Sequence, residues 1–375
     1  MPSIKKYPVL LAAPEPPATA PVRSRRGHGR VTLQEVAAQA GVTSITVSRY
    51  LREPGVVAPA TALRIQAALS ATGYVPNKQA GQLASGHSRM VAAIIPSISN
   101  SIFSETVQGL SDTLQASGYE LMLASSGYSL EREEAQIRAV LAWSPSALVV
   151  TGRHHTIGAS LLLMAAQRGR TPVVEIWDQP AEGEGNSMEA ISQVGFNHHE
   201  VGRAMAEHLL WRGHRQLAYA DSGVVEDFRA HERGAGFRAG ARAHSRANRR
   251  DPATVQLIKP PAGDAFECGR LALAQMLALP GPPITAAAFA NDHLACGALL
   301  EAQARGIRVP AQLALMGFGD FPIGRQLQPQ LSTVSPPRFD IGVQAAQVLL
   351  AALQSREPTA HRALAWRMQI RASTG

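Results

Sequence analysis

The sequence predicts a small all-α domain of the helix-turn-helix kind. A larger α/β domain follows, whose two lobes are each built on a doubly wound parallel sheet. Three observations support this prediction. Residues 30–76 carry helical periodicity with capping signals, the chain after residue 89 alternates between strand-like and helical segments, and a polar Gly/Glu-rich stretch divides that alternation in two. A length of 375 residues fits two or three domains of about 150 residues, and 45% hydrophobic residues allow sizeable cores.

The first 29 residues predict a disordered basic tail. The segment MPSIKKYPVLLAAPEPPATA resembles a secretion signal in having two lysines before an apolar patch, but the patch is short and prolines interrupt it. Residues 1–88 contain ten Lys/Arg and three Asp/Glu, so they carry +7 of the total formal charge of +8. This asymmetry is typical of a surface that meets a polyanion, and a solvated basic tail is the alternative that charge alone leaves open.

Residues 32–40 predict the first helix of the N-terminal domain. In TLQEVAAQAGVTSITVSRYL, Thr32 and Glu35 have the spacing of a capping box, in which each satisfies a backbone N–H of the first turn. Gly41 then ends the helix, because it adopts the left-handed conformation that a sharp turn needs. The apolar face follows positions i, i+3, i+4 and i+7, which are Leu33, Val36, Ala37 and Ala40.

A second and a third helix follow this turn. Thr43 is suited to cap the second helix, with Val47 and Leu51 four residues apart on its inner face. Two short helices that are joined by a glycine turn and backed by a third form the helix-turn-helix arrangement. The inner face of the third helix, which ends at Gly73, consists of Ile65, Ala68 and Leu69.

The outer face of the second helix predicts a DNA interface. Short hydroxyl side chains let a helix approach phosphates and base edges closely. The Arg49 guanidinium has the two-pronged geometry that reads O6 and N7 of guanine in the major groove. Ile45 is suited to contact a thymine methyl group, whereas a purely structural bundle would normally carry Glu and Lys at these positions. The residues predicted to contact DNA are Thr32, Thr43, Ser44, Ile45, Thr46, Ser48 and Arg49.

The remainder of the chain predicts two doubly wound parallel sheets. The strand-like runs VAAIIP, YELMLA, ALVVTG and PVVEIW come first, and ISQVGF, QLAYA, ATVQLI, ITAAAFA and QLALMGF form a second series, with helical segments between them. The linker DQPAEGEGNSMEA between the two series places the first lobe at about 89–188 and the second at about 190–330. Ligands of such folds bind beyond the carboxyl ends of the strands, so we expect a ligand cleft between the lobes.

Several function classes lack their sequence signals. No apolar run approaches the roughly 18 residues that a membrane helix needs, and the chain contains no GxxxxGK[ST], GxGxxG or GxSxG motif. HHEVGRAMAEH resembles a zinc-binding helix, but Arg203 stands where the second histidine of HExxH would be. Cys268 and Cys296 match no metal or redox spacing, and a reducing cytoplasm is the simpler location for them. We therefore expect no metal, no cofactor, no membrane segment and no enzymatic activity.

The N-terminal domain resembles that of the lactose/galactose repressor family of bacterial transcription factors. TLQEVA, AGVT, TVSRYL and GYVPN occur in the order and spacing of that family. The resemblance implies DNA contacts by Tyr74 and Asn77, and a hinge helix over about 77–88 that folds on DNA as a dimer pair. Leu83, followed by Ala84, stands at the position that inserts into the minor groove and bends the site.

The resemblance extends from about residue 89 to the C-terminus. It implies a periplasmic-binding-protein-like sensor whose chain crosses three times between the lobes, with later crossings near residues 335 and 355. PSISNSIFSETVQGL resembles the first-strand loop of the effector cleft, RAHERGAGF the segment with the effector-binding arginine, and FANDHLACGALLEAQARGIRVP the Asn-Asp segment. Where members that bind neutral sugars carry Asp after GF, this chain has Gly319. The effector residues that the resemblance implies are Ser97, Asn100, Phe103, Arg233, Asn291 and Asp320.

One branch of the family, the repressors of gluconate utilisation, has segments similar to LREP, LAWSPSALVVTGRHHT, PVVEIWDQP and GFNHHEVGRAMAEHLLWRGHR. Arg153 and His155 follow a strand end, where loops point into the cleft, and arginine binds a carboxylate with two hydrogen bonds. Glu175 and Asp178, at the end of the next strand, have oxygens for ligand hydroxyls. These residues predict a sugar-acid effector, and a solvent-facing basic turn is the alternative for the GRHH segment.

The sequence therefore predicts a ligand-responsive transcriptional repressor and not an enzyme. Its expected partners are double-stranded operator DNA with a palindromic site, a small-molecule effector of the sugar-acid class, and a second copy of the chain, all in the cytoplasm. The alternative is a cytoplasmic sugar-binding or sugar-processing protein whose N-terminal helices only join subunits. Only the repressor predicts saturable, sequence-specific retardation of DNA in a gel.

Overall fold

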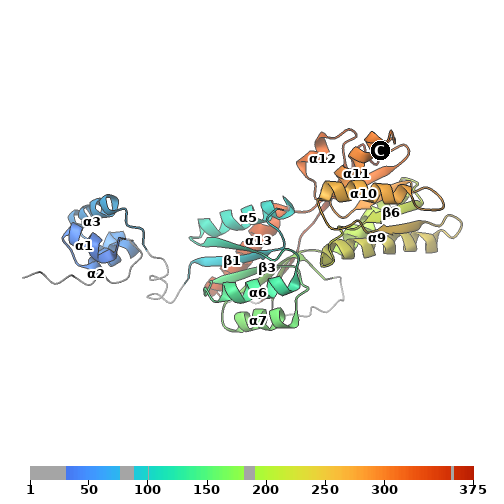
Figure 1. Cartoon of the computed structure of the whole chain (residues 1–375). Helices are drawn as coiled ribbons and strands as arrows, with labels where there is room; N and C mark the ends of the chain where they lie inside the picture. Colours follow the sequence, from blue (N-terminus) through green and yellow to red (C-terminus); the bar gives the residue numbers. More distant parts are fainter. Residues whose placement is uncertain (1–30, 77–87, 100, 181–190, 356–358) are drawn as a thin grey trace, which may run out of the picture. The chain divides into compact units, whose positions relative to one another are not determined.

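The computed structural model describes residues 31–76, 88–99, 101–180, 191–355 and 359–375. The chain divides into two compact units, Met1–Ser85 and Gly86–Gly375 (Figure 1). The expected basic tail over 1–29 and nearly all of the expected hinge over 77–88 lie outside the described residues. None of the helices in the described ranges is long and apolar enough to cross a membrane.

The described part of the first unit contains the three predicted helices. Thr32 Oγ1 accepts a hydrogen bond from the Glu35 backbone N–H at 3.3 Å, and the Glu35 carboxylate accepts one from the Thr32 N–H at 2.6 Å, which confirms the capping box. Gly41 ends the first helix with a φ of 65°, and Gly73 ends the third with a φ of 62°. The elements are α1 Leu33–Ala40, α2 Ser44–Arg52, the 3₁₀ turn η1 Pro54–Val56, and α3 Pro59–Thr72.

A small apolar core holds these helices together. Val47, on α2, is fully buried, and Val42 and Leu51 pack against the same core, as the sequence predicts. Because these side chains occupy the inner face of α2, Ile45 and Arg49 lie on its outer face. The buried residues of this core are Val36, Ala37, Ala40, Val47, Ile65 and Ala68.

The first lobe of the second unit is a six-stranded sheet with the order β11-β5-β4-β3-β1-β2, in which neighbouring strands run parallel. Helices α5 and α13 cover one face of this sheet and α6 and α7 the other (Figure 1). The strands are β1 Met90–Ile95, β2 Glu120–Ser125, β3 Ala147–Thr151, β4 Val173–Asp178, β5 Ser192–Phe196 and β11 His361–Ala363. The helices are η2 Ser101–Phe103, α5 Ser104–Ala116, α6 Leu130–Leu141, α7 Ile157–Arg168 and α13 Arg338–Ser355.

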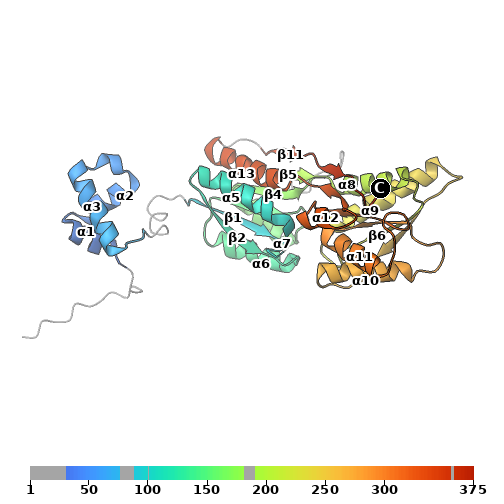
Figure 2. The ribbon, with the colours of Figure 1, turned by 90° about the horizontal axis from the view of Figure 1, so that it is seen from above.

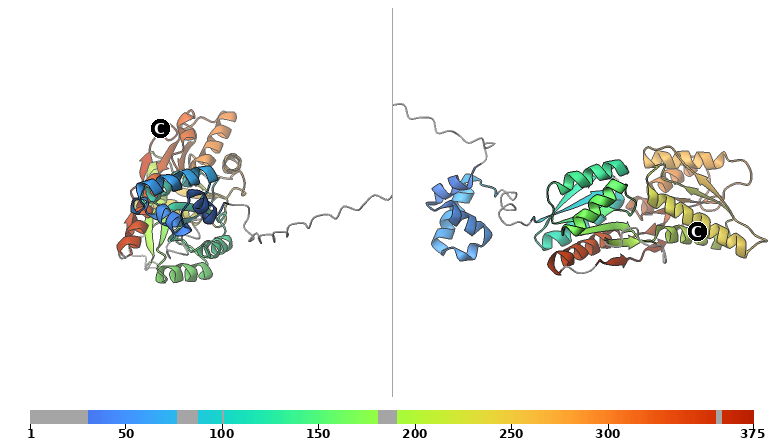
Figure 3. Two further views of the ribbon diagram at one scale, coloured as in Figure 1. Left: turned by 90° about the vertical axis from the view of Figure 1, so that its left-hand side faces the viewer. Right: turned by 90° about the horizontal axis from the view of Figure 1, so that it is seen from below.

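The second lobe repeats this architecture with the strand order β12-β10-β9-β8-β6-β7, where only the β10–β12 pair in the described ranges is antiparallel. Helices cover both faces of the sheet (Figure 3). The strands are β6 Gln216–Ala220, β7 Thr254–Ile258, β8 Ala286–Phe289, β9 Ala314–Phe318, β10 Ser332–Ser335 and β12 Arg367–Gln369. The helices are α8 His198–Trp211, α9 Phe228–Ala247, α10 Ala265–Leu277, α11 Asp292–Ala304 and α12 Pro322–Gln326.

The boundary between the lobes differs from the sequence prediction. We expected β5 to open the second lobe, but it pairs with β4 in the first sheet, because its backbone continues the parallel ladder of that strand. Figure 2 shows α13 and β11, from the C-terminal part of the chain, beside α5 and β5 of the first lobe. The chain therefore crosses between the lobes after β5, after β10 near residue 335, and between β11 and β12. The crossing expected near residue 355 is wrong.

Neighbouring helices in the second lobe approach one another closely at glycines. A Cβ atom added to Gly202 of α8 would lie 1.9 Å from the Arg233 carbonyl oxygen of α9. One added to Gly236 of α9 would lie 1.9 Å from the His199 carbonyl oxygen. Because no larger residue fits such a contact, these glycines set the distance between α8 and α9. The glycines with the same role between α10 and α11 are Gly269 and Gly297.

Candidate functional site

The outer face of α2 carries the side chains that are expected to contact bases. Thr43 caps the helix, since its Oγ1 accepts a hydrogen bond from the Thr46 backbone N–H at 3.3 Å. Ile45 is 73% exposed, and Arg49 is exposed on the same face. Within the described part of the chain, no hydrogen bond or ion pair holds the Arg49 guanidinium, so its donors are available to a ligand.

The other residues with predicted DNA contacts lie in different surroundings. Thr32 belongs to the cap of α1, and Tyr74 packs partly against the core of the first unit. The Ser48 carbonyl oxygen accepts a hydrogen bond from Arg52 Nε at 3.4 Å, while the Ser48 side chain stays half-buried. Their DNA contacts remain predictions. The predicted hinge residues outside the described ranges are Asn77, Leu83 and Ala84.

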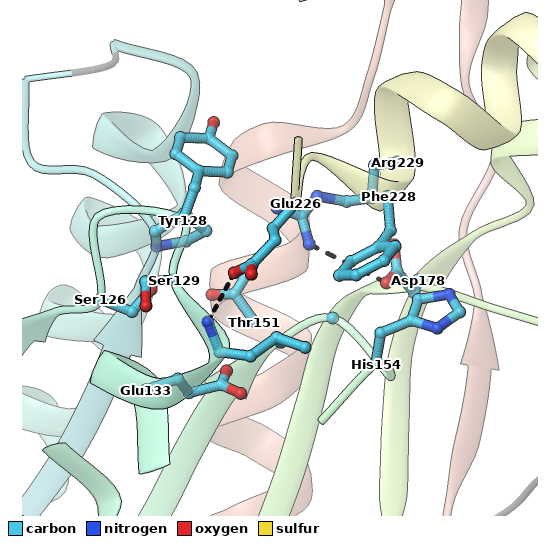
Figure 4. Close-up of a pocket in the computed structure, with 13 residues that line it drawn as sticks. Ser126, Tyr128, Ser129, Glu133, Thr151, His154, Asp178, Glu226, Phe228 and Arg229 are labelled. Carbon is cyan, nitrogen blue, oxygen red and sulfur yellow. Dashed lines mark hydrogen bonds and ion pairs between the residues drawn. The ribbon is translucent and has the colours of Figure 1, made fainter. Parts of the chain in front are cut away.

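A narrow cavity in two parts lies between the lobes of the second unit, and Figure 4 shows one of the two parts. Each part has a volume of about 30 Å³, so a ligand the size of a sugar requires side chains or lobes to move. The first lobe contributes residues that include Ile102, Phe103, Tyr128, Glu133, Thr151, His154, Trp177 and Asp178. The second lobe contributes residues that include His198, Glu226, Asp227, Phe228, Arg229, Arg233, Ala290, Asn291 and Phe318.

Arg233, the predicted effector-binding arginine, lines this cavity and is held by three contacts. Its Nη1 donates a hydrogen bond to His198 Nδ1 at 2.9 Å, and its Nη2 donates one to the Ala290 carbonyl oxygen at 2.8 Å. The guanidinium carbon also lies 4.0 Å from the centre of the Phe318 ring, a distance typical of a cation–π contact. The protein therefore already binds both terminal nitrogens of this buried arginine.

His198 and Asp178 meet beside Arg233, from opposite lobes. Since His198 Nδ1 accepts from Arg233, its Nε2 carries the proton and donates it to the Trp177 carbonyl oxygen at 3.1 Å. Asp178 Oδ1 lies 3.3 Å from the same Nε2 and has no hydrogen bond among the described residues. Burial, helped by the charge of Arg233, lowers the pKa of His198, so the imidazole is neutral. Burial would raise the pKa of Asp178, but the His198 N–H and the Arg229 charge lower it to about 2.

Arg229, near the start of α9, lines both parts of the cavity. Figure 4 shows its guanidinium directed toward Asp178, and the shortest N–O distance between the two side chains is 3.9 Å. The same guanidinium lies 5.9 Å from the centre of the Phe103 ring. Arg229 is not among the residues predicted from the sequence. The available signal was its position four residues before Arg233, which puts both arginines on one face of a helix.

The GRHH turn after β3 connects the first lobe to α9 of the second. Arg153 Nη2 and His154 Nε2 each lie 3.1 Å from Glu232 Oε1. Burial opposes ionisation of Glu232, but these two partners lower its pKa. Arg153 is not among the residues that line the cavity, whereas His154 is, with its ring 4.7 Å from that of Phe228.

The other two polar residues expected in the cleft, His155 and Glu175, are buried inside the first lobe and do not line the cavity. His155 Nδ1 lies 2.8 Å from Glu133 Oε2, and its Nε2 lies 3.5 Å from Glu175 Oε1. Gln193 Nε2 donates a hydrogen bond to Glu175 at 2.6 Å. The polar atoms of His155 and Glu175, which were expected to bind a ligand, therefore contact other groups of the protein.

The residues assigned through the family resemblance separate into two groups. Phe103 and Asn291 line the cavity, and Asn291 also caps α11 by accepting a hydrogen bond from the Leu294 N–H at 3.0 Å. Ser97 lies outside the cavity lining, with its hydroxyl 2.9 Å from that of Ser99. The remaining member of the predicted set, outside the described residues, is Asn100.

Asp320, the candidate next to Gly319, lies in an ion-pair cluster of the second lobe. Arg325 Nη2 lies 2.9 Å from its Oδ2, and Arg371 pairs with its Oδ1. Burial would raise the pKa of Asp320, but these two arginines lower it. Asp320 does not line the cavity. No cluster of three His, Cys, Asp or Glu side chains in the described ranges is arranged to hold a metal ion.

Comparison with known proteins accounts for both units. The family model described as bacterial regulatory proteins, lacI family, matches residues 32–77, and the one described as a periplasmic binding protein-like domain matches residues 206–374. The chain is 39% identical over 335 residues to the HTH-type transcriptional regulator GntR of Pseudomonas aeruginosa, with 89% of this chain and 93% of the relative covered. It is 32% identical over 333 residues to the regulator of the same name from Escherichia coli K12, and the aligned residues cover 88% of this chain and 94% of the relative.

Solved structures agree with these relatives. A LacI-family transcriptional regulator from Silicibacter pomeroyi has a TM-score of 0.80 at 32% identity, with 92% of this chain and 99% of that chain covered. The lac repressor dimer bound to operator has a TM-score of 0.77 at 23% identity, with the same coverage, and shares the fold. Both curated relatives are transcriptional regulators and not enzymes. The chain belongs to the LacI family of bacterial regulatory proteins and is a ligand-responsive, DNA-binding transcriptional regulator.

Proposed function

We propose that this regulator represses genes of sugar-acid catabolism as a cytoplasmic homodimer. Each copy of the α2 face reads one half of a palindromic operator, while the expected hinge over 77–88 inserts Leu83 into the minor groove. A sugar acid of the gluconate type binds between the lobes and releases the DNA. We assign DNA binding to 30–76, with a basic tail before it, and effector binding and dimerisation to 89–375.

The observation that carries this proposal is an interlobe cavity that holds two buried arginines, Arg229 and Arg233, in a chain that also carries a helix-turn-helix. Guanidinium groups bind carboxylates with paired, charge-assisted hydrogen bonds, so two of them in one cavity favour an anionic effector. The absence of an acidic side chain at Gly319 supports the same ligand class, because an Asp there would add negative charge to that position.

Two observations support a dimer. Helix-turn-helix proteins bind symmetric sites with two recognition helices, and the lac repressor, which shares this fold, is a dimer on its operator in the solved structure. The edge strands β2 and β7 carry partly exposed leucines, Leu123 and Leu257, at 40% and 38% exposure. An exposed apolar edge strand is suited to association with a second chain.

A gel-shift titration of the full chain against fragments of its source genome tests the proposal. We expect saturable, sequence-specific retardation with two chains per site, and release of the DNA by D-gluconate or 2-keto-D-gluconate but not by D-glucose. Binding without sequence preference contradicts the regulator as described, and favours a sugar-binding protein with an association domain. Release by neutral sugars alone contradicts the sugar-acid effector.

A further inference from the structure

Arg229 is a buried arginine whose guanidinium has no hydrogen-bond acceptor among the residues that the structure describes. The residue is 9% exposed, and in the described ranges its only charged partner within 4 Å is Asp178, at 3.9 Å. Arginine has five N–H donors, and burying a charge without hydrogen bonds is unfavourable. Since Arg229 lines both parts of the cavity, its donors are within reach of a ligand that enters it.

The other two arginines near the cavity are already engaged. Arg233 donates through both terminal nitrogens to His198 and to the Ala290 carbonyl oxygen. Arg153 donates to Glu232 at 3.1 Å and does not line the cavity. A ligand carboxylate therefore displaces no protein hydrogen bond at Arg229, whereas it would have to displace one at either of the others.

Asp178 lies next to Arg229 and is suited to accept a hydrogen bond from the same ligand. Its Oδ2 accepts the Arg153 backbone N–H at 3.1 Å, while its Oδ1 has no hydrogen bond among the described residues. The neighbouring His198 does not donate a hydrogen bond to this Oδ1, because its Nε2–H is directed to the Trp177 carbonyl oxygen. An ionised carboxylate only accepts hydrogen bonds, so the group that meets it has to be a donor such as a hydroxyl.

We propose that the cavity recognises an α-hydroxy acid, with the ligand carboxylate on Arg229 and the hydroxyl of the adjacent carbon on Asp178. This inference rests on the proposed function, because it names which sugar acids the regulator senses and which side chains select them. A 2-deoxy sugar acid has the carboxylate for Arg229 but no hydroxyl on the adjacent carbon to donate to Asp178. A neutral sugar has hydroxyls for Asp178 but no negative charge for Arg229.

Isothermal calorimetry on the full chain with D-gluconate, 2-deoxy-D-gluconate and D-glucose tests the inference. Wild type binds D-gluconate at least about 10-fold more tightly than the deoxy acid, as expected for one lost hydrogen bond to a charged group. Arg229→Gln weakens D-gluconate binding by about 10- to 100-fold and removes the advantage over D-glucose. Asp178→Asn narrows the affinity ratio between the two acids, because a neutral amide accepts the hydroxyl hydrogen bond more weakly than a carboxylate does.

Arg238→Gln, an exposed arginine on the same helix, is the matched control and leaves all three affinities unchanged. Arg229→Lys keeps the positive charge but lacks the two-pronged guanidinium group. It is used in place of Arg229→Gln if circular dichroism shows that the glutamine variant is not folded. If wild type binds hydroxy acids while Arg229→Gln and Arg229→Lys keep the wild-type affinity, the inference is overturned and the proposed function stands. If wild type binds operator but none of the acids, the sugar-acid effector fails together with the inference.

Discussion

His155, which was expected in the ligand cleft, instead makes the stability of the protein depend on pH. Its imidazole is buried between two glutamates: Nδ1 is hydrogen-bonded to Glu133 at 2.8 Å, and Nε2 lies 3.5 Å from a carboxylate oxygen of Glu175. Burial alone lowers the pKa of a histidine, but the hydrogen bond to Glu133 and the two negative charges outweigh burial and raise the pKa from 6.5 to about 9. The folded protein therefore holds a proton that the unfolded chain releases near neutral pH.

This raised pKa predicts that the second unit loses stability in mild alkali. The stabilisation is fully present below pH 6.5 and is lost as the pH rises to about 9, because the folded state then binds more protons than the unfolded state. The loss is on the order of 3 kcal/mol. Urea unfolding between pH 6 and pH 9.5 measures it. His155→Gln should flatten the dependence, whereas His199→Gln, at an exposed position, should not. A wild-type slope that survives His155→Gln contradicts this assignment.

We expect substitution of Arg49 to weaken base recognition without affecting folding. Its side chain is exposed and unpaired in the described ranges, so Arg49→Ala should leave the melting temperature of the first unit nearly unchanged. Specific DNA binding should weaken by about 1–3 kcal/mol, and the preference at one base position should relax. Competition assays with single-base variants of the operator measure both effects, and Arg64→Ala on α3 is the control. Wild-type selectivity in the Arg49 variant would place base reading elsewhere.

At the scale of elements, most of the fold could be predicted from signals that are local in the sequence. The remainder depends on which strands pair in each sheet. Capping at Thr32, the turn at Gly41 and the alternating apolar segments could all be recognised, because each depends on neighbours in sequence. The sheet to which β5 belongs could not, since a buried parallel strand looks the same in either sheet. The same limit applies to the cavity. Arg233 could be predicted from the sequence, whereas Arg229 was not predicted and Glu175 was wrongly placed in the cleft. The reason is that hydrogen bonds between distant strands decide which polar groups are free.

The helix pair α8–α9 predicts that one methyl group disturbs both packing and ligand binding. In Gly202→Ala the new Cβ would meet the Arg233 carbonyl oxygen at 1.9 Å, so the helices must separate. Such overpacking costs about 1–3 kcal/mol of unfolding free energy. Effector affinity should fall as well, since Arg229 and Arg233 both lie on α9. Denaturant unfolding and calorimetry measure the two effects. Gly263→Ala, where the nearest atom is Cys268 Sγ at 3.7 Å, should change neither. An unchanged midpoint for Gly202→Ala would contradict the close contact.

At the scale of the whole sensor, contacts between the lobes lie beside the cavity. The Leu130 backbone N–H of the first lobe donates to Glu226 of the second at 2.7 Å, and Glu232 joins α9 to the turn that holds Arg153 and His154. A ligand shifts the balance between two lobe arrangements only through a difference in its affinity for them. We expect an effector to act on DNA binding by strengthening or breaking these contacts between the lobes.

Linkage predicts that operator and effector oppose each other by the same factor. If effector weakens operator binding 5- to 150-fold, a typical range for allosteric coupling, then a saturating operator duplex weakens effector binding equally. Calorimetry with D-gluconate in the presence and absence of the duplex measures this factor, and a scrambled duplex is the control. Equal effector affinity with and without operator would show that the lobes are not coupled to DNA.

The last twenty residues of the described chain contribute an edge strand to each sheet, β11 to the first and β12 to the second, and Ser373 and Thr374 are buried in the second lobe. Neither lobe is complete, therefore, in a nascent chain from which residues 361–374 have not yet emerged. Folding of the sensor has to follow synthesis through Thr374 and cannot finish lobe by lobe. A chain that stops after Ser355 lacks both strands, so β5 and β10 become edge strands with unpaired backbone groups, and we expect that fragment to aggregate or to be degraded.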